Sequence, residues 1–294
     1  MTAPRLAVLV PCYDEVATIA EVIRAFRQHL PGAEVVGLDN ASTDSTAAEA
    51  AAAGATVIQV AARGKGNVVR RAFADVDADI YVLVDGDNTY SAASAPMLVE
   101  LLRKHRLDMV VGCRESQSSF AYRSGHRFGN RLLTACVAWV FGRAFSDMLS
   151  GYRVFSRRYV KSFPAHAVGF EIETELSVHA LQLRMPVAEA GTPYGARPAG
   201  SHSKLSTWRD GLRILATILG LIKSEKPLLF FGVFACLWAI GSGLLSIPLL
   251  DTFWQTGRVP RFPTAVLCAA LMVLAAISLT CGAVLVNVTR GRVE

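Results

Sequence analysis

Two long apolar runs near the end of the chain constrain its fold more than any other feature. Residues 227–250 read PLLFFGVFACLWAIGSGLLSIPLL and residues 263–289 read PTAVLCAALMVLAAISLTCGAVLVNVT, without one charged side chain. A helix needs about 20 apolar residues to cross the hydrocarbon core of a membrane. Both runs exceed that length, and they explain why a chain of 294 residues is 52% hydrophobic. The sequence predicts a C-terminal two-helix transmembrane hairpin over residues 227–289, against the alternative of two buried core helices.

Cationic side chains are concentrated on one side of this hairpin. Those before the first run and after the second are Arg209, Arg213, Lys223, Lys226, Arg290 and Arg292. The connecting loop, expected over residues 251–262, offers only Arg258 and Arg261. Because cytoplasmic loops carry the excess of Lys and Arg, we expect the N-terminal portion and the tail, residues 290–294, in the cytoplasm. We therefore expect a multi-pass protein of the inner (plasma) membrane. The N-terminal run LAVLV ends at Pro11 and does not have the pattern of a signal peptide.

The segment before the first run, residues 206–226, has the pattern of an amphipathic helix. Its apolar side chains are spaced four, three, four and three residues apart, at Trp208, Leu212, Leu215, Leu219 and Ile222. Basic residues surround this stripe, as in helices that lie in the plane of a membrane interface. We expect an interfacial helix here, and a helix packed on a soluble domain is the equal alternative.

The first two thirds of the chain alternate between strand-like and helix-like stretches. The runs typical of strands are residues 6–10, 34–39, 55–60, 79–85 and 108–113, and the helical ones are residues 18–30, 43–53, 66–74 and 95–104. Strands that are apolar throughout and alternate with helices indicate a parallel sheet covered on both faces. We therefore predict an α/β domain with a mostly parallel sheet over residues 1–205. In such sheets ligands bind beyond the carboxyl ends of the strands.

Polar residues collect where the predicted strands end. They are Tyr13, Asp14 and Glu15 after the first strand, Asp39 and Asn40 after the second, Arg63 and Lys65 after the third, Asp85 and Asp87 after the fourth, and Arg114 after the fifth. One such cluster is ordinary loop chemistry. Five at one edge of a sheet indicate a site.

The pair Asp85 and Asp87 is the most informative of these clusters. In an extended chain, residues two apart project to the same side, so both carboxylates can converge on one ligand. When two carboxylates converge in this way, the pKa of one of them rises unless a cation neutralises their charge. A hard ion, Mg²⁺ or Mn²⁺, prefers oxygen ligands and keeps positions for phosphate oxygens. The pair therefore indicates a metal-bound diphosphate, with a solvated turn as the alternative.

Other motifs exclude several classes of protein. GKG at residues 64–66 lacks the spacing of a phosphate-binding P-loop, although Lys65 before a helix can still attract an anion, and G-x-G-x-x-G is missing after the first strand. The six cysteines include no C-x-x-C pair, so neither a zinc site nor a disulfide framework is indicated. The net charge of +6 fits an anionic membrane leaflet, and no basic run with interleaved aromatics points to nucleic acid.

Seven short motifs follow one another in an order that resembles a known family. They are PCYDE (11–15), DNASTDST (39–46), GKG (64–66), DGD (85–87), SGYRVF (150–155), GFEIETE (169–175) and RPAGSHSK (197–204). Their order is similar to that of family 2 glycosyltransferases with the GT-A fold, within them most similar to the polyprenyl-phosphate glycosyltransferases that include dolichol-phosphate mannose synthase. The resemblance covers roughly residues 5–215, and the paired C-terminal runs match bacterial members.

This resemblance implies roles for particular residues on the donor side. Pro11, Tyr13 and Glu15 match the family's P-x-Y-N-E motif, which lines the nucleotide pocket, with Asp14 in place of the usual Asn. Asp39 matches the acid expected to contact the base, and its neighbour Asn40 replaces a second Asp.

Further along the chain, Asp85 matches the acid near the ribose or metal, and Asp87 the principal metal ligand. Thr89 stands where many relatives have Gln, which puts a third metal ligand in doubt. A mobile basic loop that closes over phosphates is matched by Arg197, Ser203 and Lys204.

On the acceptor side, three arginines recur every four residues, at Arg123, Arg127 and Arg131. A helix would align them on one face. With Arg114 they form a basic cradle suited to a lipid phosphate, because guanidinium groups bind phosphate with paired hydrogen bonds. The alternative is a solvated helix face.

The expected activity is that of a membrane-anchored, inverting, metal-dependent hexosyltransferase. It would move a sugar from a UDP- or GDP-linked donor to an undecaprenyl or dolichyl phosphate at the cytoplasmic face, and the hairpin would allow a homo-oligomer. A phosphate monoester has its second pKa near 6, so it is already an anionic nucleophile and needs no general base. The alternatives are a hydroxyl acceptor, with Glu171 or Glu173 as base, and a non-catalytic scaffold. A processive synthase is disfavoured because Q-x-x-R-W is absent.

Overall fold

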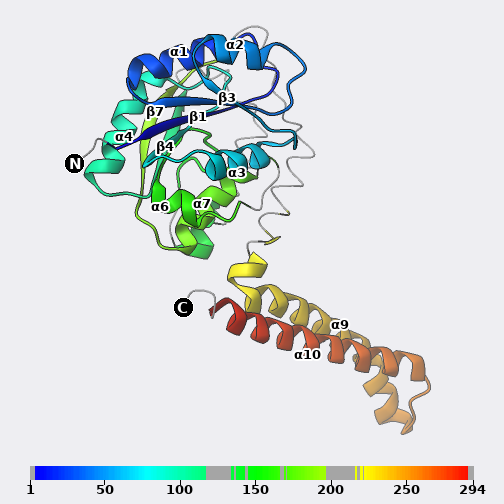
Figure 1. Cartoon of the computed structure of the whole chain (residues 1–294). Coiled ribbons are helices and arrows are strands. Elements are labelled where there is room, and N and C mark those ends of the chain that lie inside the picture. Colours follow the sequence, from blue (N-terminus) through cyan, green and yellow to red (C-terminus); the bar gives the residue numbers. More distant parts are fainter. Residues whose placement is uncertain are drawn as a thin grey trace. The chain divides into compact units, whose positions relative to one another are not determined.

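The computed structural model describes residues 4–116, 134–135, 137–142, 145–165, 169, 171–196, 216, 219–220 and 222–290. The chain divides into two compact units, Met1–Ile214 and Leu215–Glu294, each of which has its own architecture (Figure 1).

The first unit is built on a seven-stranded sheet in the order β3-β2-β1-β4-β6-β5-β7. The strands are β1 (Leu6–Cys12), β2 (Glu34–Asp39), β3 (Thr56–Gln59), β4 (Ile80–Leu83), β5 (Met109–Ser116), β6 (Arg153–Ser156) and β7 (Val187–Tyr194). All neighbouring strands pair in parallel except β6, which is antiparallel to both β4 and β5. The mostly parallel sheet is therefore confirmed, and β6 and β7 are additions that the alternating pattern did not indicate.

Helices cover both faces of this sheet. They are α1 (Ile19–His29), α2 (Thr46–Ala52), α3 (Lys65–Asp75), α4 (Ala95–Lys104), α6 (Arg157–Ser162) and α7 (Ile172–Gln182), with a short 3₁₀ turn, η1 (Ala92–Ser94). Figure 1 shows α1 and α2 above the sheet and α3, α6 and α7 below it. The four helices predicted before residue 105 are confirmed within a few residues. Helix α7 was not predicted, because it is buried on almost every side and so lacks an amphipathic period.

The second unit is a hairpin of two long helices, α9 (Pro227–Thr256) and α10 (Phe262–Arg290). Both are long and apolar enough to cross a membrane, and only 11% of the most apolar window of each is buried, unlike the core helix of a soluble protein. Their packing is close at one point, because a Cβ on Gly282 would lie 3.2 Å from the Cα of Leu228. The hairpin predicted from composition is thus present as a helical pair.

Helix α9 is longer than the predicted run. It continues through Asp251 to Thr256 and ends at Gly257, whose φ of +63° is the left-handed conformation that commonly closes a helix. The connecting loop is therefore confined to residues 257–261, shorter than the expected residues 251–262. Polar residues inside the last turns do not end α9, because their side chains bond within the helix; Thr252 Oγ1, for example, donates to the carbonyl of Pro248 at 2.7 Å.

Most of the predicted interfacial helix lies outside the described residues. Within residues 206–226 the structure describes 216, 219–220 and 222–226, and all of these except Lys226 are helical. Leu219 is exposed and Ile222 is half-buried. Trp208, Leu212 and Leu215 are not among the described residues.

Candidate active site

The carboxyl ends of β1, β2 and β4 meet at one edge of the sheet. Cys12 at the end of β1 is in register with Asp39 at the end of β2, and Leu9 with Leu83 at the end of β4. The backbone continues this pairing beyond the strands, since the N–H of Val84 donates to the carbonyl of Leu9 at 3.1 Å. Topology therefore gathers the polar residues after these strands, as the sequence predicted.

A buried ammonium group lies at the centre of this edge. Lys65, the first residue of α3, forms ion pairs with Asp85 and with Glu173, the latter at 2.5 Å from Nζ to Oε1. Burial alone would lower the pKa of Lys65, but the charges of Asp85 and Glu173 and the hydrogen bonds to them raise it well above its ordinary value. Lys65 therefore stays cationic, and it links three segments that are distant in sequence.

The backbone at Gly151 packs closely against the side chain of Asp85. Gly151 lies so near that a Cβ added to it would collide with the Asp85 carboxylate. The N–H of Gly151 donates to the hydroxyl of Tyr90 at 2.9 Å, and burial raises the pKa of that hydroxyl well above its ordinary value. Tyr90 thus stays a neutral phenol that fixes Gly151 against Asp85.

The second carboxylate, Asp87, is oriented by its own turn. Its side chain is buried, and Oδ1 accepts hydrogen bonds from the backbone N–H of Thr89 at 3.2 Å and from the Thr89 hydroxyl at 2.6 Å. Thr89 therefore orients Asp87. Between the two acids, a Cβ on Gly86 would lie 3.2 Å from the carbonyl oxygen of Pro11, so a side chain at this position would require a small shift of the backbone.

The carboxylates fit a divalent cation by their chemistry. Among the residues that the structure describes, no group of three or more His, Cys, Asp and Glu side chains could hold a metal ion. Two neighbouring carboxylates nonetheless suit Mg²⁺ or Mn²⁺, which bind proteins through one or two carboxylates and complete their shell with water and substrate phosphate.

Asp39 carries an unsatisfied acceptor. Its side chain is buried, and Oδ1 has no hydrogen-bond partner among the described residues. Buried polar atoms are nearly always paired, so an unpaired one at a ligand-binding edge is suited to a donor group from a ligand. Asn40, which replaces the family's second acid, has a different task. Its amide donates to the carbonyl of Ala62 at 2.7 Å and accepts from the N–H of Gly64 at 2.7 Å, which fixes the loop before Lys65.

The motif after β1 is fixed from β2 and α2. Asp14, with φ of +48°, accepts a hydrogen bond from the N–H of Thr43 at 2.7 Å. Glu15 is buried, and its N–H donates to the Thr46 hydroxyl at 2.8 Å. Sequence reasoning treated Asp14 as one of the polar residues after the first strand and as a departure from the family pattern, whereas the structure gives it a role in joining two loops.

Two further residues of the predicted nucleotide pocket lie at the same edge. Pro11 belongs to β1, and the guanidinium of Arg63 lies 5.2 Å from the centre of the Tyr13 ring. Tyr13 is half-buried, so part of this residue remains accessible at the edge.

Arg114 is already held by a carboxylate. Its Nε and Nη2 both donate to Asp147 at 2.7 Å, and its guanidinium lies 5.6 Å from the Tyr194 ring. Burial would raise the pKa of Asp147, but the hydrogen bonds and charge of Arg114 outweigh it and hold this pKa below its usual value. The remaining members of the predicted phosphate cradle, Arg123, Arg127 and Arg131, lie outside the described residues.

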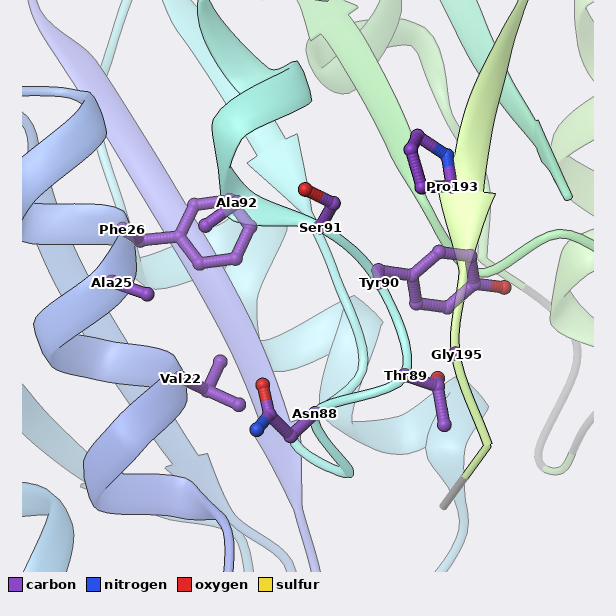
Figure 2. Close-up of a pocket in the computed structure, with 10 residues that line it drawn as sticks. All are labelled: Val22, Ala25, Phe26, Asn88, Thr89, Tyr90, Ser91, Ala92, Pro193 and Gly195. Atoms are coloured by element: carbon purple, nitrogen blue, oxygen red, sulfur yellow. The ribbon is translucent and has the colours of Figure 1, made fainter. Parts of the chain in front are cut away.

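The last described residues before the predicted basic loop lie beside the turn that follows Asp87. The N–H of Gly195, just after β7, donates to the carbonyl of Thr89 at 2.8 Å, and the Tyr90 and Tyr194 rings are 5.1 Å apart. Figure 2 shows Thr89 and Tyr90 facing Gly195. Arg197, Ser203 and Lys204 themselves lie outside the described residues.

A pocket opens beside the turn that follows Asp87, between α1 and the end of β7 (Figure 2). Its lining includes Val22, Phe26, Asn88 and Pro193, and none of the described residues that line it is charged. The pocket therefore lacks the chemistry that a diphosphate requires, and the candidate site is the edge around Lys65 and the two acids.

Sequence reasoning missed the position of Glu173. It considered this residue only as an alternative base, because nothing in the local sequence indicates a partner in α3. The signal that could have drawn attention to it is the glutamate-rich start of an otherwise buried helix, GFEIETE.

Comparison with known proteins agrees with this arrangement. Residues 7–162 match the model described as Glycosyl transferase family 2. The chain is 35% identical to Glycosyltransferase AglJ of Haloferax volcanii, over 79% of this chain and 76% of that protein. It is 26% identical to the dolichyl-phosphate hexose transferase of the same organism, over 75% of this chain and 95% of that one.

Solved structures agree as well. Glucosyl-3-phosphoglycerate synthase from Mycobacterium tuberculosis, in complex with Mn²⁺, UDP-glucose and phosphoglyceric acid, superposes with a TM-score of 0.61 at 26% identity, over 74% of this chain and 80% of that one. The fold is thus that of a GT-A glycosyltransferase. The chain belongs to glycosyl transferase family 2, which confirms the family that the motifs predicted.

Proposed function

We propose that the protein transfers a sugar from a UDP- or GDP-linked donor to a polyprenyl phosphate at the cytoplasmic face of the inner (plasma) membrane. The observation that carries this proposal is a family 2 domain with Asp85, Asp87 and Lys65 at its ligand edge, followed in the same chain by two helices apolar enough to span a membrane. A relative named for hexose transfer to dolichyl phosphate supports the choice of acceptor.

The donor's nucleotide would bind at the edge formed by β1, β2 and β4. Tyr13 remains partly accessible, and Asp39 offers a buried oxygen that lacks a hydrogen-bond partner among the described residues. Both uracil and guanine carry a ring N–H, so either base can satisfy that oxygen. Pro11 and Glu15 complete the wall of the pocket.

The diphosphate of the donor would lie toward the two acids. Asp87 and Asp85 would hold Mg²⁺ or Mn²⁺, which when bound would neutralise charge on the departing diphosphate. Lys65 places a fixed positive charge at the same edge. From the predicted basic loop, Arg197 and Lys204 would add positive charge that is expected to stabilise the leaving group.

The acceptor phosphate would attack the anomeric carbon without a general base, because at neutral pH it is already largely a dianion. Direct displacement would invert the anomeric centre. Arg123, Arg127, Arg131 and Ser203 are proposed to hold this phosphate, together with Arg114. The ion pair between Glu173 and Lys65 weakens the rival hypothesis of a hydroxyl acceptor, because it occupies one of the two glutamates that could serve as base.

The proposal is tested with the purified full chain in lipid nanodiscs. Labelled UDP- and GDP-sugars are supplied one at a time with undecaprenyl phosphate, with and without EDTA. We expect a lipid-linked, phosphate-bridged product with one donor and its loss on chelation. Transfer only to a hydroxyl acceptor, or no transfer with any donor, would contradict the proposal.

A further inference from the structure

We infer that Glu173 is a positioning residue: it is the permanent counter-ion of Lys65, and it leaves Asp85 able to engage the donor. This inference rests on the proposed function, because it concerns the site at which the nucleotide diphosphate would bind. It assigns to Glu173 neither the role of a base nor a purely structural one.

The geometry brings three charged side chains together from three separate segments. The Lys65 ammonium contacts Glu173 Oε1 at 2.5 Å and also contacts Asp85 Oδ1. The side chains of Lys65 and Glu173 are 10% and 7% exposed, whereas that of Asp85 is 28% exposed. Glu173 is therefore the enclosed partner, and Asp85 is the partner that a ligand can reach.

Positive charge and helix geometry surround Glu173. It lies in the first turn of α7, where unpaired backbone N–H groups and the helix dipole stabilise negative charge. It also lies within electrostatic reach of Arg153, a fully buried arginine. A buried carboxylate without such support would be costly. The fold therefore holds the Glu173 side chain beside Lys65 and within reach of a second buried cation.

One lysine does not need two carboxylates for its own charge balance. Asp85 alone would neutralise Lys65, and a buried one-to-one ion pair would then hold Asp85 away from any other cation. With Glu173 present, Lys65 retains a partner when Asp85 turns to the donor. The second carboxylate therefore lowers the free energy needed to release Asp85.

Removing the charge of Glu173 should change the affinity for a diphosphate in the direction opposite to the one that net charge alone would produce. Removing a carboxylate near an anion-binding site should tighten the binding of a diphosphate if only net charge matters. If Glu173 keeps Asp85 available, removing its charge should weaken that binding. A general base would change the rate of transfer and leave donor binding unaltered.

The experiment measures nucleotide binding without acceptor, by titration calorimetry on the full chain with Mn²⁺. The ligands are UDP and GDP. Glu173→Gln, which keeps the shape of the side chain, should raise the Kd of the nucleotide about tenfold, the lower range for a disturbed buried charge pair. The matched control is Glu175→Gln, the same change two residues further along α7, where the half-buried side chain is not one of the two carboxylates that pair with Lys65 among the described residues. It should leave the Kd within about twofold.

Two further variants separate positioning from structure. Glu173→Asp retains the charge and should recover part of the lost affinity. In a Lys65→Met background, adding Glu173→Gln should cause no further weakening, because the cation that Glu173 serves is gone. Further weakening in the Lys65→Met background would contradict the inference, and this comparison remains possible even if the single Glu173→Gln variant does not fold. Thermal unfolding of each variant identifies losses that come from misfolding.

The other outcomes are equally decisive. An unchanged or lower Kd for Glu173→Gln, with or without a fall in kcat, would overturn the inference while leaving the proposed function intact. Failure of the unmodified protein to bind either nucleotide would overturn both.

Discussion

The ligand edge of the sheet and the C-terminal helix pair are stabilised in opposite ways. At the edge, buried charges meet across long stretches of sequence, as Lys65 does with Glu173. In the helix pair the side-chain hydrogen bonds are mostly local, such as the bond from Ser278 Oγ to the carbonyl of Leu274 at 2.8 Å. Helices satisfy their own backbone and can therefore face lipid, whereas buried charges require exact partners. Function should be sensitive at the first region and tolerant at the second.

The largest expected effect concerns Asp87. Replacing Asp87 by Asn removes the charge that Thr89 orients, and transfer should fall by roughly 10²–10³-fold, as when an electrostatic group at a transition state is lost. Initial rates at saturating Mn²⁺ measure the effect. Asp75→Asn is the control, because its half-exposed side chain pairs only with Arg71 among the described residues. Full activity of Asp87→Asn would remove the acidic pair from the mechanism.

The second largest effect on transfer is expected for a glycine at the ligand edge, and a glycine in the helix pair serves as its comparison. Gly151→Ala places a methyl group against the Asp85 carboxylate and should lower transfer by up to about 10²-fold, because small displacements of reacting groups are costly. Gly243→Ala in α9 meets no atom within 4 Å and should leave the rate unchanged. Equal rates for both variants would mean that Asp85 tolerates displacement.

A smaller effect follows from pH. His179 is buried between Tyr159 and Phe163, and burial lowers its pKa from 6.5, although Glu175 acts in the opposite direction. A lowered pKa means that the neutral form is favoured by folding. The stability this provides is present above pH 6.5 and is lost as the pH falls through the folded-state pKa.

Acid should therefore weaken the sheet domain and leave the helix pair intact. His179→Gln should reduce the loss of stability between pH 7 and pH 5, as measured by thermal unfolding followed by near-ultraviolet circular dichroism. Identical pH slopes for the variant and the unmodified protein would exclude His179 as the source.

The smallest effect is expected in the helix pair itself. Ser242 is buried and donates to the carbonyl of Cys268 at 2.9 Å, one of few bonds that join α9 to α10. Ser242→Ala should cost about 0.6 kcal/mol of pairing free energy, typical of hydrogen bonds within membranes. Unfolding in mixed micelles measures it. A loss of transfer activity would contradict the tolerance expected of this region.

Much of the fold could be predicted because its signals are local. The strands and helices up to Lys104 follow apolar runs and helical spacing that the chain carries within each element, and the apolar stretches of α9 and α10 are long enough to stand alone. The antiparallel strand β6 could not be predicted from such signals, because four residues carry little pattern and the pairing with β4 is made with a distant segment. The C-terminal extension of α9 was missed because Asp251 looked like the start of a loop.

The residues of the candidate site likewise fall into those that local sequence signals predict and those that they do not. Asp39, Asp85 and Asp87 were predicted because each directly follows an apolar strand. The roles of Asn40 and Thr89 were not, since both depend on hydrogen-bond geometry that residue order alone does not specify.

The sequence by itself determined the alternation of strands and helices, the edge at which polar residues gather, and the apolar helix pair, because each depends on neighbours along the chain. Only the tertiary structure decided which charges meet. The ammonium of Lys65 lies between carboxylates from two other segments, and such a meeting depends on how β4, α3 and α7 pack rather than on their separate sequences.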